Sequence, residues 1–252
     1  MSPSPTASKT FESMGTNPNR CSTFRFKQFE IVNSLSAMKV GTDGVLLGAW
    51  ADNDKTDRIL DIGSGSGLIS LMLAQRFPDA RITGIEIDPQ ATAEARLNAS
   101  NTAWQDRITF ICNDFCEWST DEKFDMIVSN PPFFTNGLKS PDSSRATARH
   151  AAGLSPASIL DRASKMLDPD GVIAMIVPAD MVDNLIFEAT MHRLNPLKIT
   201  NVTTRAGKPP RRALISFTPK ACAVASSIFT ISGADGFTPE YRDLTHEFYL
   251  EF

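Results

Sequence analysis

The stretch that most limits the possible folds is Gly63-Ser64-Gly65-Ser66-Gly67, in which glycines alternate with serines between two apolar segments. Residues 58–62 are typical of a buried strand, and residues 68–77 are typical of a helix that ends at Pro78. A strand, a glycine-rich turn and a helix in succession let a ligand approach the backbone closely at the helix N-terminus. This order predicts a ligand site in an α/β fold, and a purely structural turn is the plain alternative.

The glycine spacing indicates which ligand to expect. A dinucleotide fingerprint needs G-x-G-x-x-G, but Leu68 stands where its last glycine would be. The pattern is instead Asp61-x-Gly63-x-Gly65-x-Gly67, which resembles the first motif of Rossmann-like methyltransferases that use S-adenosylmethionine. The resemblance implies that Asp61 and these three glycines bind this cofactor.

Two further strands end in acidic side chains. Residues 81–88 end in Glu86 and Asp88, and a carboxylate at that edge can accept both ribose hydroxyls. Glu86 is the preferred candidate, since Asp88 can cap the helix that Pro89 opens. After the strand 108–112, Asp114 could accept from the adenine amine of the cofactor and Phe115 could stack on its ring.

A fourth strand ends in Ser129-Asn130-Pro131-Pro132-Phe133. The prolines lack a backbone N–H and stop the strand, so that the Asn130 amide and the carbonyls face outward. Such a site suits a planar base whose amine donates to the Asn130 side chain and the Pro131 carbonyl while Phe133 stacks on its ring. A proline-terminated turn is the alternative without function.

Strands and helices alternate along the chain, which predicts a mostly parallel sheet with helices on both faces. The turn 208–212 joins two strands as a hairpin, so one end of the sheet should be antiparallel. We expect a Rossmann-like class I methyltransferase fold with a seven-stranded sheet. Residues 1–22 should form a disordered tail, because they are rich in Ser, Thr, Pro and Asn, and residues 23–252 should form one domain.

Composition excludes several classes of protein. At 252 residues, with 42% hydrophobic and 21% charged residues, the chain is long enough for one well-filled core. No apolar run reaches the roughly 20 residues of a membrane span, and no signal peptide is recognisable, so we expect a cytoplasmic protein. We also expect it to be a monomer. The cysteines and histidines are too scattered for a metal site.

The net charge of −4 does not by itself indicate nucleic-acid binding, but the charges are unevenly distributed. Residues 189–234 contain no acid and seven basic residues, which predicts one basic face. The candidate phosphate ligands are Lys208, Arg211 and Arg212, with Arg145 and Arg149 from the loop after Phe133.

A glycine-rich turn and apolar helix, residues 39–50, come before the first motif. Thr42 or Asp43 could cap this helix, and its free N–H groups beside Lys39 could hold a carboxylate. This stretch, the Asp61–Gly67 motif, Asn130-Pro131-Pro132-Phe133 and the ending 241–252 together resemble the bacterial methyltransferases that modify the N6 amine of adenosine 37 in a valine tRNA. The resemblance covers residues 24–252, and residues 39–50 are its most specific part.

The resemblance implies that Lys39, Thr42, Asp43 and also Asn130 belong to the cofactor site and that the substrate is an anticodon loop. An aryl amine is a weak nucleophile that needs no strong base, so catalysis should rest on positioning by Asn130, Pro131 and Phe133. An unpaired loop base leaves its stack more easily than a duplex base, which favours RNA as the substrate.

Three other functions are compatible with parts of this sequence. A protein glutamine methyltransferase would use the same acceptors, but those enzymes usually carry Tyr where this chain has Phe133. A DNA adenine methyltransferase would need a target-recognition insertion that is not evident. A non-catalytic RNA-binding module could retain the cofactor fold, although the intact Asn130 argues against it.

Overall fold

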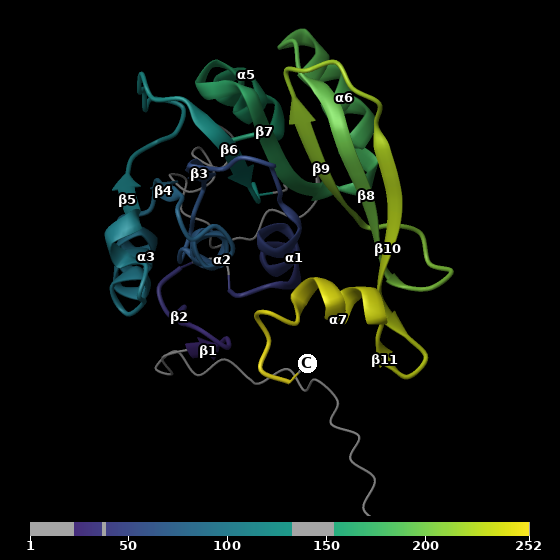
Figure 1. Ribbon diagram of the computed structural model, residues 1–252, viewed down its shortest axis with the longest axis horizontal. Helices are drawn as coiled ribbons and strands as arrows, with labels where there is room; N and C mark the ends of the chain where they lie inside the picture. Colours follow the sequence, from purple (N-terminus) through teal and green to yellow (C-terminus); the bar gives the residue numbers. More distant parts are fainter. Residues whose placement is uncertain (1–22, 37–38, 133–153, 252) are drawn as a thin grey trace, which may run out of the picture.

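One sheet dominates the computed structural model, which describes residues 23–36, 39–132 and 154–251 (Figure 1). A separate hairpin precedes it. The strands are β1 (Thr23–Arg25) and β2 (Glu30–Val32) of the hairpin, then β3 (Arg58–Ile62), β4 (Arg81–Glu86), β5 (Ile108–Cys112), β6 (Phe124–Ser129), β7 (Leu167–Pro178), β8 (Asn195–Arg205), β9 (Arg212–Thr218), β10 (Ala225–Gly233) and β11 (Gly236–Phe237). The order across the sheet is β11-β10-β8-β9-β7-β6-β3-β4-β5.

The part of the sheet from β5 to β8 has the expected arrangement. Its strands are parallel except β9, which runs antiparallel to both β7 and β8. The Rossmann-like α/β class and its antiparallel end are therefore confirmed, and the turn between β8 and β9 is the predicted hairpin.

The predicted number of seven strands is too low, because the described residues form a sheet of nine. β10 adds to the edge of the sheet by pairing parallel to β8, and the short β11 pairs with its end. The first four residues of β10 are exposed. This strand therefore lacks the continuous apolar run that marks the interior strands in the sequence.

Helices cover both faces of the sheet, as expected (Figure 1). α1, α2, α3 and α7 contribute to one apolar cluster, and α5 and α6 contribute to the other. Among the described helices, none is long and apolar enough to cross a membrane. Their bounds are α1 (Thr42–Trp50), α2 (Leu68–Arg76), α3 (Pro89–Ser100), α5 (Pro156–Met166), α6 (Val182–Met191) and α7 (Pro239–Thr245), with 3-10 turns at Gln105–Arg107 and Ala179–Met181.

The two faces follow from the alternation of side chains along each strand. In β3, Ile59 belongs to the cluster under α1 and α2, whereas Leu60 and Ile62 belong to the cluster under α5 and α6. Asp61 has the same parity as Ile59, so its carboxylate points toward α2, and the residue is fully buried. An acid at this position costs burial energy, which indicates a role beyond packing.

The β1–β2 hairpin packs against the last described residues of the chain. Phe26 and Phe29 stack with ring centroids 4.7 Å apart, and the Phe26 ring lies 5.9 Å from that of Tyr249. The Lys27 amide donates to the Phe248 carbonyl at 2.8 Å. The segment leading into α1 is therefore held at its start by the segment that follows α7.

Candidate active site

The glycine turn between β3 and α2 adopts a conformation that glycine allows and other residues resist. Gly63, Gly65 and Gly67 have φ angles of 72°, 55° and 85°. A Cβ on Gly67 would lie 2.9 Å from the Phe110 ring and 3.3 Å from the Ala95 methyl. Gly67 is the N-cap of α2 and supplies no side-chain acceptor, and Asp61 accepts from the Ser70 amide. The amides of Leu68 and Ile69 in the same first turn are the ones that a ligand can use.

Asp61 supports this turn from behind. One carboxylate oxygen, Oδ2, accepts from the Ser70 amide at 3.1 Å and the Ser70 hydroxyl at 2.7 Å. The other oxygen, Oδ1, is buried and has no partner among the described residues. Burial raises the pKa of Asp61 to about 7, the nearby charge of Glu86 adds to this, and the Ser70 hydrogen bonds oppose it. Asp61 itself does not line the cavity described below.

Substituting Asp61 by Asn should flatten the dependence of folding stability on pH. The ordinary pKa of 3.8 applies to the unfolded chain, so between pH 3.8 and about 7 the folded state binds the proton more tightly. Stability therefore falls as pH rises through this window, and Asn removes that term. Urea unfolding of wild type and Asp61→Asn at pH 5 and pH 8 measures it. If both proteins lost the same free energy of unfolding between pH 5 and pH 8, the expectation would be contradicted.

Glu86 lies at the carboxyl end of β4, as predicted, and contacts the glycine turn. Its Oε2 accepts from the Gly65 amide at 2.9 Å, and its Oε1 accepts from the Asp88 amide at 2.9 Å. Asp88 caps α3 by accepting from the Gln90 amide at 2.8 Å, which confirms the capping interpretation. The ribose-binding role of Glu86 stays a prediction, and the carboxylate lies on the correct edge for it.

Asp114 and Phe115 follow β5, on the same edge of the sheet. The Asp114 side chain accepts from the Cys116 amide at 2.8 Å and so forms a local turn. Phe115 is only 4% exposed and packs in the cluster on the α5 and α6 face, with the Arg162 guanidinium 5.7 Å from its ring. Stacking of Phe115 on adenine stays a prediction, and it would require this buried ring to move outward.

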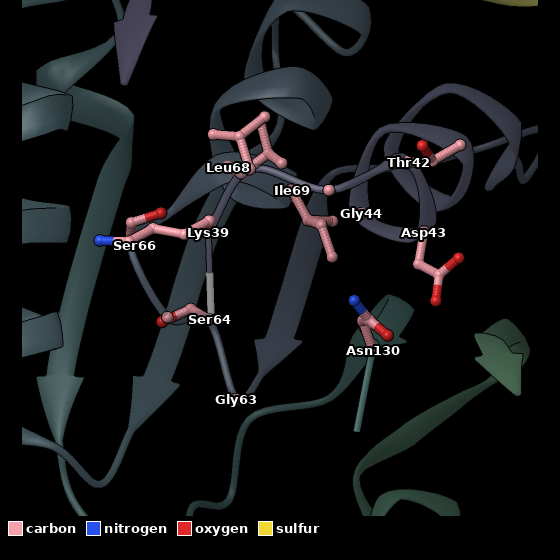
Figure 2. Close-up of a pocket in the computed structure, with 13 residues that line it drawn as sticks. Lys39, Thr42, Asp43, Gly44, Gly63, Ser64, Ser66, Leu68, Ile69 and Asn130 are labelled. Atoms are coloured by element: carbon pink, nitrogen blue, oxygen red, sulfur yellow. The ribbon is translucent and has the colours of Figure 1, made fainter. Parts of the chain in front are cut away.

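A cavity of about 340 Å³ opens where β3 and β6 end (Figure 2). Small-molecule sites typically measure roughly 300–1,000 Å³. Asn130 is brought there because Ser129 pairs with Ile62, which places it beside the start of the glycine turn. The lining residues are Lys39, Val40, Gly41, Thr42, Asp43, Gly44, Gly63, Ser64, Gly65, Ser66, Leu68, Ile69 and Asn130.

Asn130 reaches from the end of β6 toward the space between the glycine turn and the first turn of α1 (Figure 2). Its side-chain oxygen Oδ1 is buried and finds no hydrogen-bond partner among the described residues. Ser64 Oγ is in the same situation on the opposite wall. Buried polar atoms are normally satisfied, so unpartnered ones at a cavity indicate a ligand that supplies the missing partners.

The first turn of α1 forms the wall facing the glycine turn. Thr42 begins this helix and Asp43 follows, while Gly41 precedes it with no side-chain cap. The predicted capping by Thr42 or Asp43 is therefore wrong, since both lie inside the helix. The Lys39 ammonium donates to the carbonyls of Asn33 at 2.6 Å and Ser34 at 3.4 Å.

Two buried side chains of α3, which the sequence did not single out, anchor the segment before Lys39. The Glu94 carboxylate accepts from the amides of Ser34, Leu35 and Ser36 at 2.6, 2.9 and 3.0 Å. Burial raises the pKa of Glu94, but hydrogen bonds from Ser36, Leu35 and Ser34 outweigh it and hold the pKa below the ordinary value.

Asn98 lies one turn further along the same helix. It accepts from the Val32 amide and donates to the carbonyls of Val32 and Ser66, each at 2.9 Å. Asn98 therefore connects the segment after the hairpin directly to the glycine turn. In the sequence, only the spacing of Glu94 and Asn98, four residues apart within one helix, could have indicated this anchoring role. That spacing is common on any helix.

The basic residues predicted to share one face are separated. β8 is an 11-residue strand, about 36 Å long at 3.3 Å per residue, and its ends lie at opposite edges of the sheet. Lys198 lies over the Trp50 ring at 4.7 Å, and Lys220 pairs with Asp170 at 2.9 Å, both away from the cavity. The prediction of one basic face is wrong, because the long strands divide the cations.

The turn between β8 and β9 does bring basic residues to the edge of the cavity. Arg212 pairs with Pro178, where β7 ends, and Arg211 accepts from the Ala179 amide at 3.3 Å. Lys208 and Arg211 are exposed there. Arg212 instead contacts Asp43, with Nε and Oδ2 2.7 Å apart.

Some of the predicted features lie outside the described residues. They are the site residues Phe133, Arg145 and Arg149 and the tail 1–22.

Within the described ranges, no three His, Cys, Asp or Glu side chains converge on a position that could hold a metal ion. The residues that line the cavity carry backbone amides, hydroxyls, a carboxylate, a carboxamide and the Lys39 ammonium. This set suits a polar organic ligand that carries both donors and acceptors.

Known proteins resemble this chain over most of its length. The family model described as "Methyltransferase small domain" matches residues 24–201. A tRNA1(Val) (adenine(37)-N6)-methyltransferase of Bacteroides thetaiotaomicron is 42% identical over 230 residues, covering 90% of this chain and 97% of the relative. The enzyme of the same name from Porphyromonas gingivalis is 45% identical over 240 residues, covering 90% and 94%.

Solved structures show the same fold at lower identity. A predicted O-methyltransferase from Agrobacterium tumefaciens has a TM-score of 0.65 and 22% identity, covering 82% of this chain and 96% of that one. A precorrin-6y C5,15-methyltransferase from Geobacter metallireducens has a TM-score of 0.51 and 19% identity, covering 74% and 93%. Because full-length relatives exceed 40% identity, this chain belongs to the tRNA1(Val) (adenine(37)-N6)-methyltransferase family, within the small-domain methyltransferases.

Proposed function

We propose that this protein transfers a methyl group from S-adenosylmethionine to the exocyclic N6 amine of adenosine 37 in the anticodon loop of a valine tRNA. The observation that carries this proposal is the buried, unpartnered Oδ1 of Asn130, which faces a cavity whose other wall is a glycine turn. The names of the relatives indicate the same reaction and the same substrate.

The residues around the cavity fit the cofactor. The positive φ angles of Gly63, Gly65 and Gly67 leave no side chain between the ligand and the backbone amides. Lys39 and the start of α1 offer positive charge and free N–H groups to the carboxylate of the methionine part. Glu86 would accept the ribose hydroxyls. When bound, S-adenosylmethionine supplies a methyl group activated by its sulfonium centre.

Asn130 and Pro131 hold the substrate amine. The Asn130 oxygen and the Pro131 carbonyl accept one N–H each, which orients the lone pair of the nitrogen toward the methyl donor. The amine proton is acidic after attack and can leave without a strong base, so positioning supplies most of the rate enhancement. Phe133 would stack on the adenine, a contact worth roughly 1–3 kcal/mol per base.

The basic turn between β8 and β9 is the proposed phosphate-binding element. Lys208 and Arg211 lie in this turn, and the Arg211 carbonyl accepts from the Ala179 amide directly after β7, on the same edge of the sheet as Asn130. Exposed cations beside the active site can hold the backbone of an extruded loop base. Activity should therefore fall steeply as salt is added. A cytoplasmic, monomeric enzyme is part of this proposal.

Transfer of labelled methyl to total tRNA lacking the modification tests the proposal. We expect N6-methyladenosine at position 37 of a valine tRNA, located by nucleoside analysis and mapping of the labelled fragment. Heat-denatured enzyme is the control for carry-over of label. Label in protein glutamine would overturn the tRNA assignment, although the methyltransferase fold and cofactor would stand. Label in DNA would instead indicate a DNA adenine methyltransferase. No transfer to any substrate would indicate a non-catalytic RNA-binding module.

A further inference from the structure

An ion pair connects the cofactor cavity to the basic turn. The Arg212 Nε lies 2.7 Å from Asp43 Oδ2, and the two side chains are 37% and 30% exposed. These residues are 169 positions apart in sequence. Asp43 lines the cavity together with Asn130, whereas Arg212 is the first residue of β9.

Arg212 is well placed to hold another element. Its backbone lies between two strands, opposite Pro178 of β7 and Val202 of β8, so its Cα is fixed by the sheet. Its guanidinium also donates to the Arg211 carbonyl at 3.2 Å. The sheet fixes the backbone of Arg212, and its guanidinium bonds to the Asp43 carboxylate. Arg212 can therefore hold that carboxylate at a fixed position relative to the sheet.

The first turn of α1 needs such support. The N-cap residue Gly41 has extended backbone, with φ −125° and ψ 159°, and supplies no side chain to the free amides. Gly44 to Trp50 are buried, whereas Gly41 and Thr42 are exposed. The buried part of the helix is held by packing, and the ion pair between Asp43 and Arg212 ties the turn that faces the cavity to the sheet.

Arg212 differs in this respect from its two basic neighbours. Lys208 and Arg211 are exposed, and neither pairs with an acidic side chain within the described residues. The charge of Arg212 is largely balanced by Asp43, which makes it the weakest phosphate ligand of the three. This placement departs from the sequence-based assignment of Arg212 to phosphate binding.

We propose that Arg212 is a positioning residue of the cofactor site, acting through Asp43 on the wall formed by the first turn of α1, and that it does not bind tRNA phosphates. Lys208 and Arg211 bind them. The assignment to cofactor binding rests on the proposed methyltransferase function, and its test uses a binding measurement made without RNA.

Two matched variants separate the roles, Arg212→Met and Arg211→Met. Calorimetric titration with S-adenosylmethionine alone should show roughly tenfold weaker binding for Arg212→Met, the scale of one charge-assisted hydrogen bond, and no change for Arg211→Met. Filter binding of valine tRNA at several salt concentrations should show a salt slope lowered by about 1 for Arg211→Met only. Arg212→Lys should restore part of the cofactor affinity.

The proposal would be overturned if Arg212→Met bound S-adenosylmethionine as tightly as wild type. It would also be overturned if the salt slope of tRNA binding were lowered in that variant. Thermal unfolding checks that the variants are folded, and Asp43→Asn provides a second route if Arg212→Met is not. Asp43→Asn should weaken cofactor binding by a similar factor, and the double variant should be no weaker than the weaker single one. If the wild-type protein bound cofactor but no tRNA, the tRNA assignment would be wrong. The measured effect of Arg212→Met on cofactor affinity would still stand.

Discussion

Asn130→Ala should reduce the rate of methyl transfer by roughly 10³-fold while cofactor binding changes little, because the side-chain oxygen acts on the substrate amine. Its Oδ1 is the buried acceptor that has no partner among the described residues. Without it, one N–H of the amine loses its acceptor and the lone pair is no longer held in line with the methyl group. Single-turnover transfer to valine tRNA, with S-adenosylmethionine affinity measured separately, tests both parts.

Asn113→Ala is a matched control for this substitution. Asn113 is also an asparagine directly after a parallel strand, but it is exposed and does not line the cavity. Its removal should leave the transfer rate within about twofold of wild type, as surface substitutions usually do. Methylation by Asn130→Ala at the wild-type rate would exclude the positioning mechanism.

Gly67→Ala should lower the free energy of unfolding by roughly 2–5 kcal/mol and weaken cofactor binding, because two costs add at this residue. A left-handed backbone costs a non-glycine residue about 1–2 kcal/mol, and φ is 85° here. The added methyl would also lie 2.9 Å from the Phe110 ring, an overpacking that typically costs about 1–3 kcal/mol. Urea unfolding with and without S-adenosylmethionine measures both effects.

Gly207→Ala separates the backbone cost from the packing cost. Gly207 has a similar φ of 76°, lies in the turn between β8 and β9, and has nothing within 4 Å of the position of an added Cβ. It should lose only about 1–2 kcal/mol and retain cofactor affinity. Equal losses at Gly67 and Gly207 would show that contact with Phe110 contributes nothing.

Features encoded within a few residues were predictable from the sequence. The apolar segments around the glycine turn became β3 and α2, and Asp88 with Pro89 became a helix start. The convergence of Asn130 and the glycine turn was also predictable, because parallel strands present their carboxyl ends at one edge. Local pattern and this one rule of sheet topology account for the position of the cavity.

Features that depend on long-range packing were not predictable. The contact between Asp43 and Arg212 joins residues 169 positions apart, and no local pattern distinguishes Arg212 from Arg211. The buried role of Glu94 depends on three amides of a segment about 60 residues away. Phe115 shows the same limit, because only the tertiary structure shows that its ring packs inward.

The contact between the β1–β2 hairpin and the residues around Phe248 bears on the synthesis of the protein. During translation, the glycine turn and Asn130 leave the ribosome well before Arg212 and Phe248. The nascent chain can therefore form the central strands early, but the contacts of Lys27 with Phe248 and of Asp43 with Arg212 cannot form until the C-terminal residues have emerged. Cofactor binding should thus be acquired late in synthesis, after the sheet has formed.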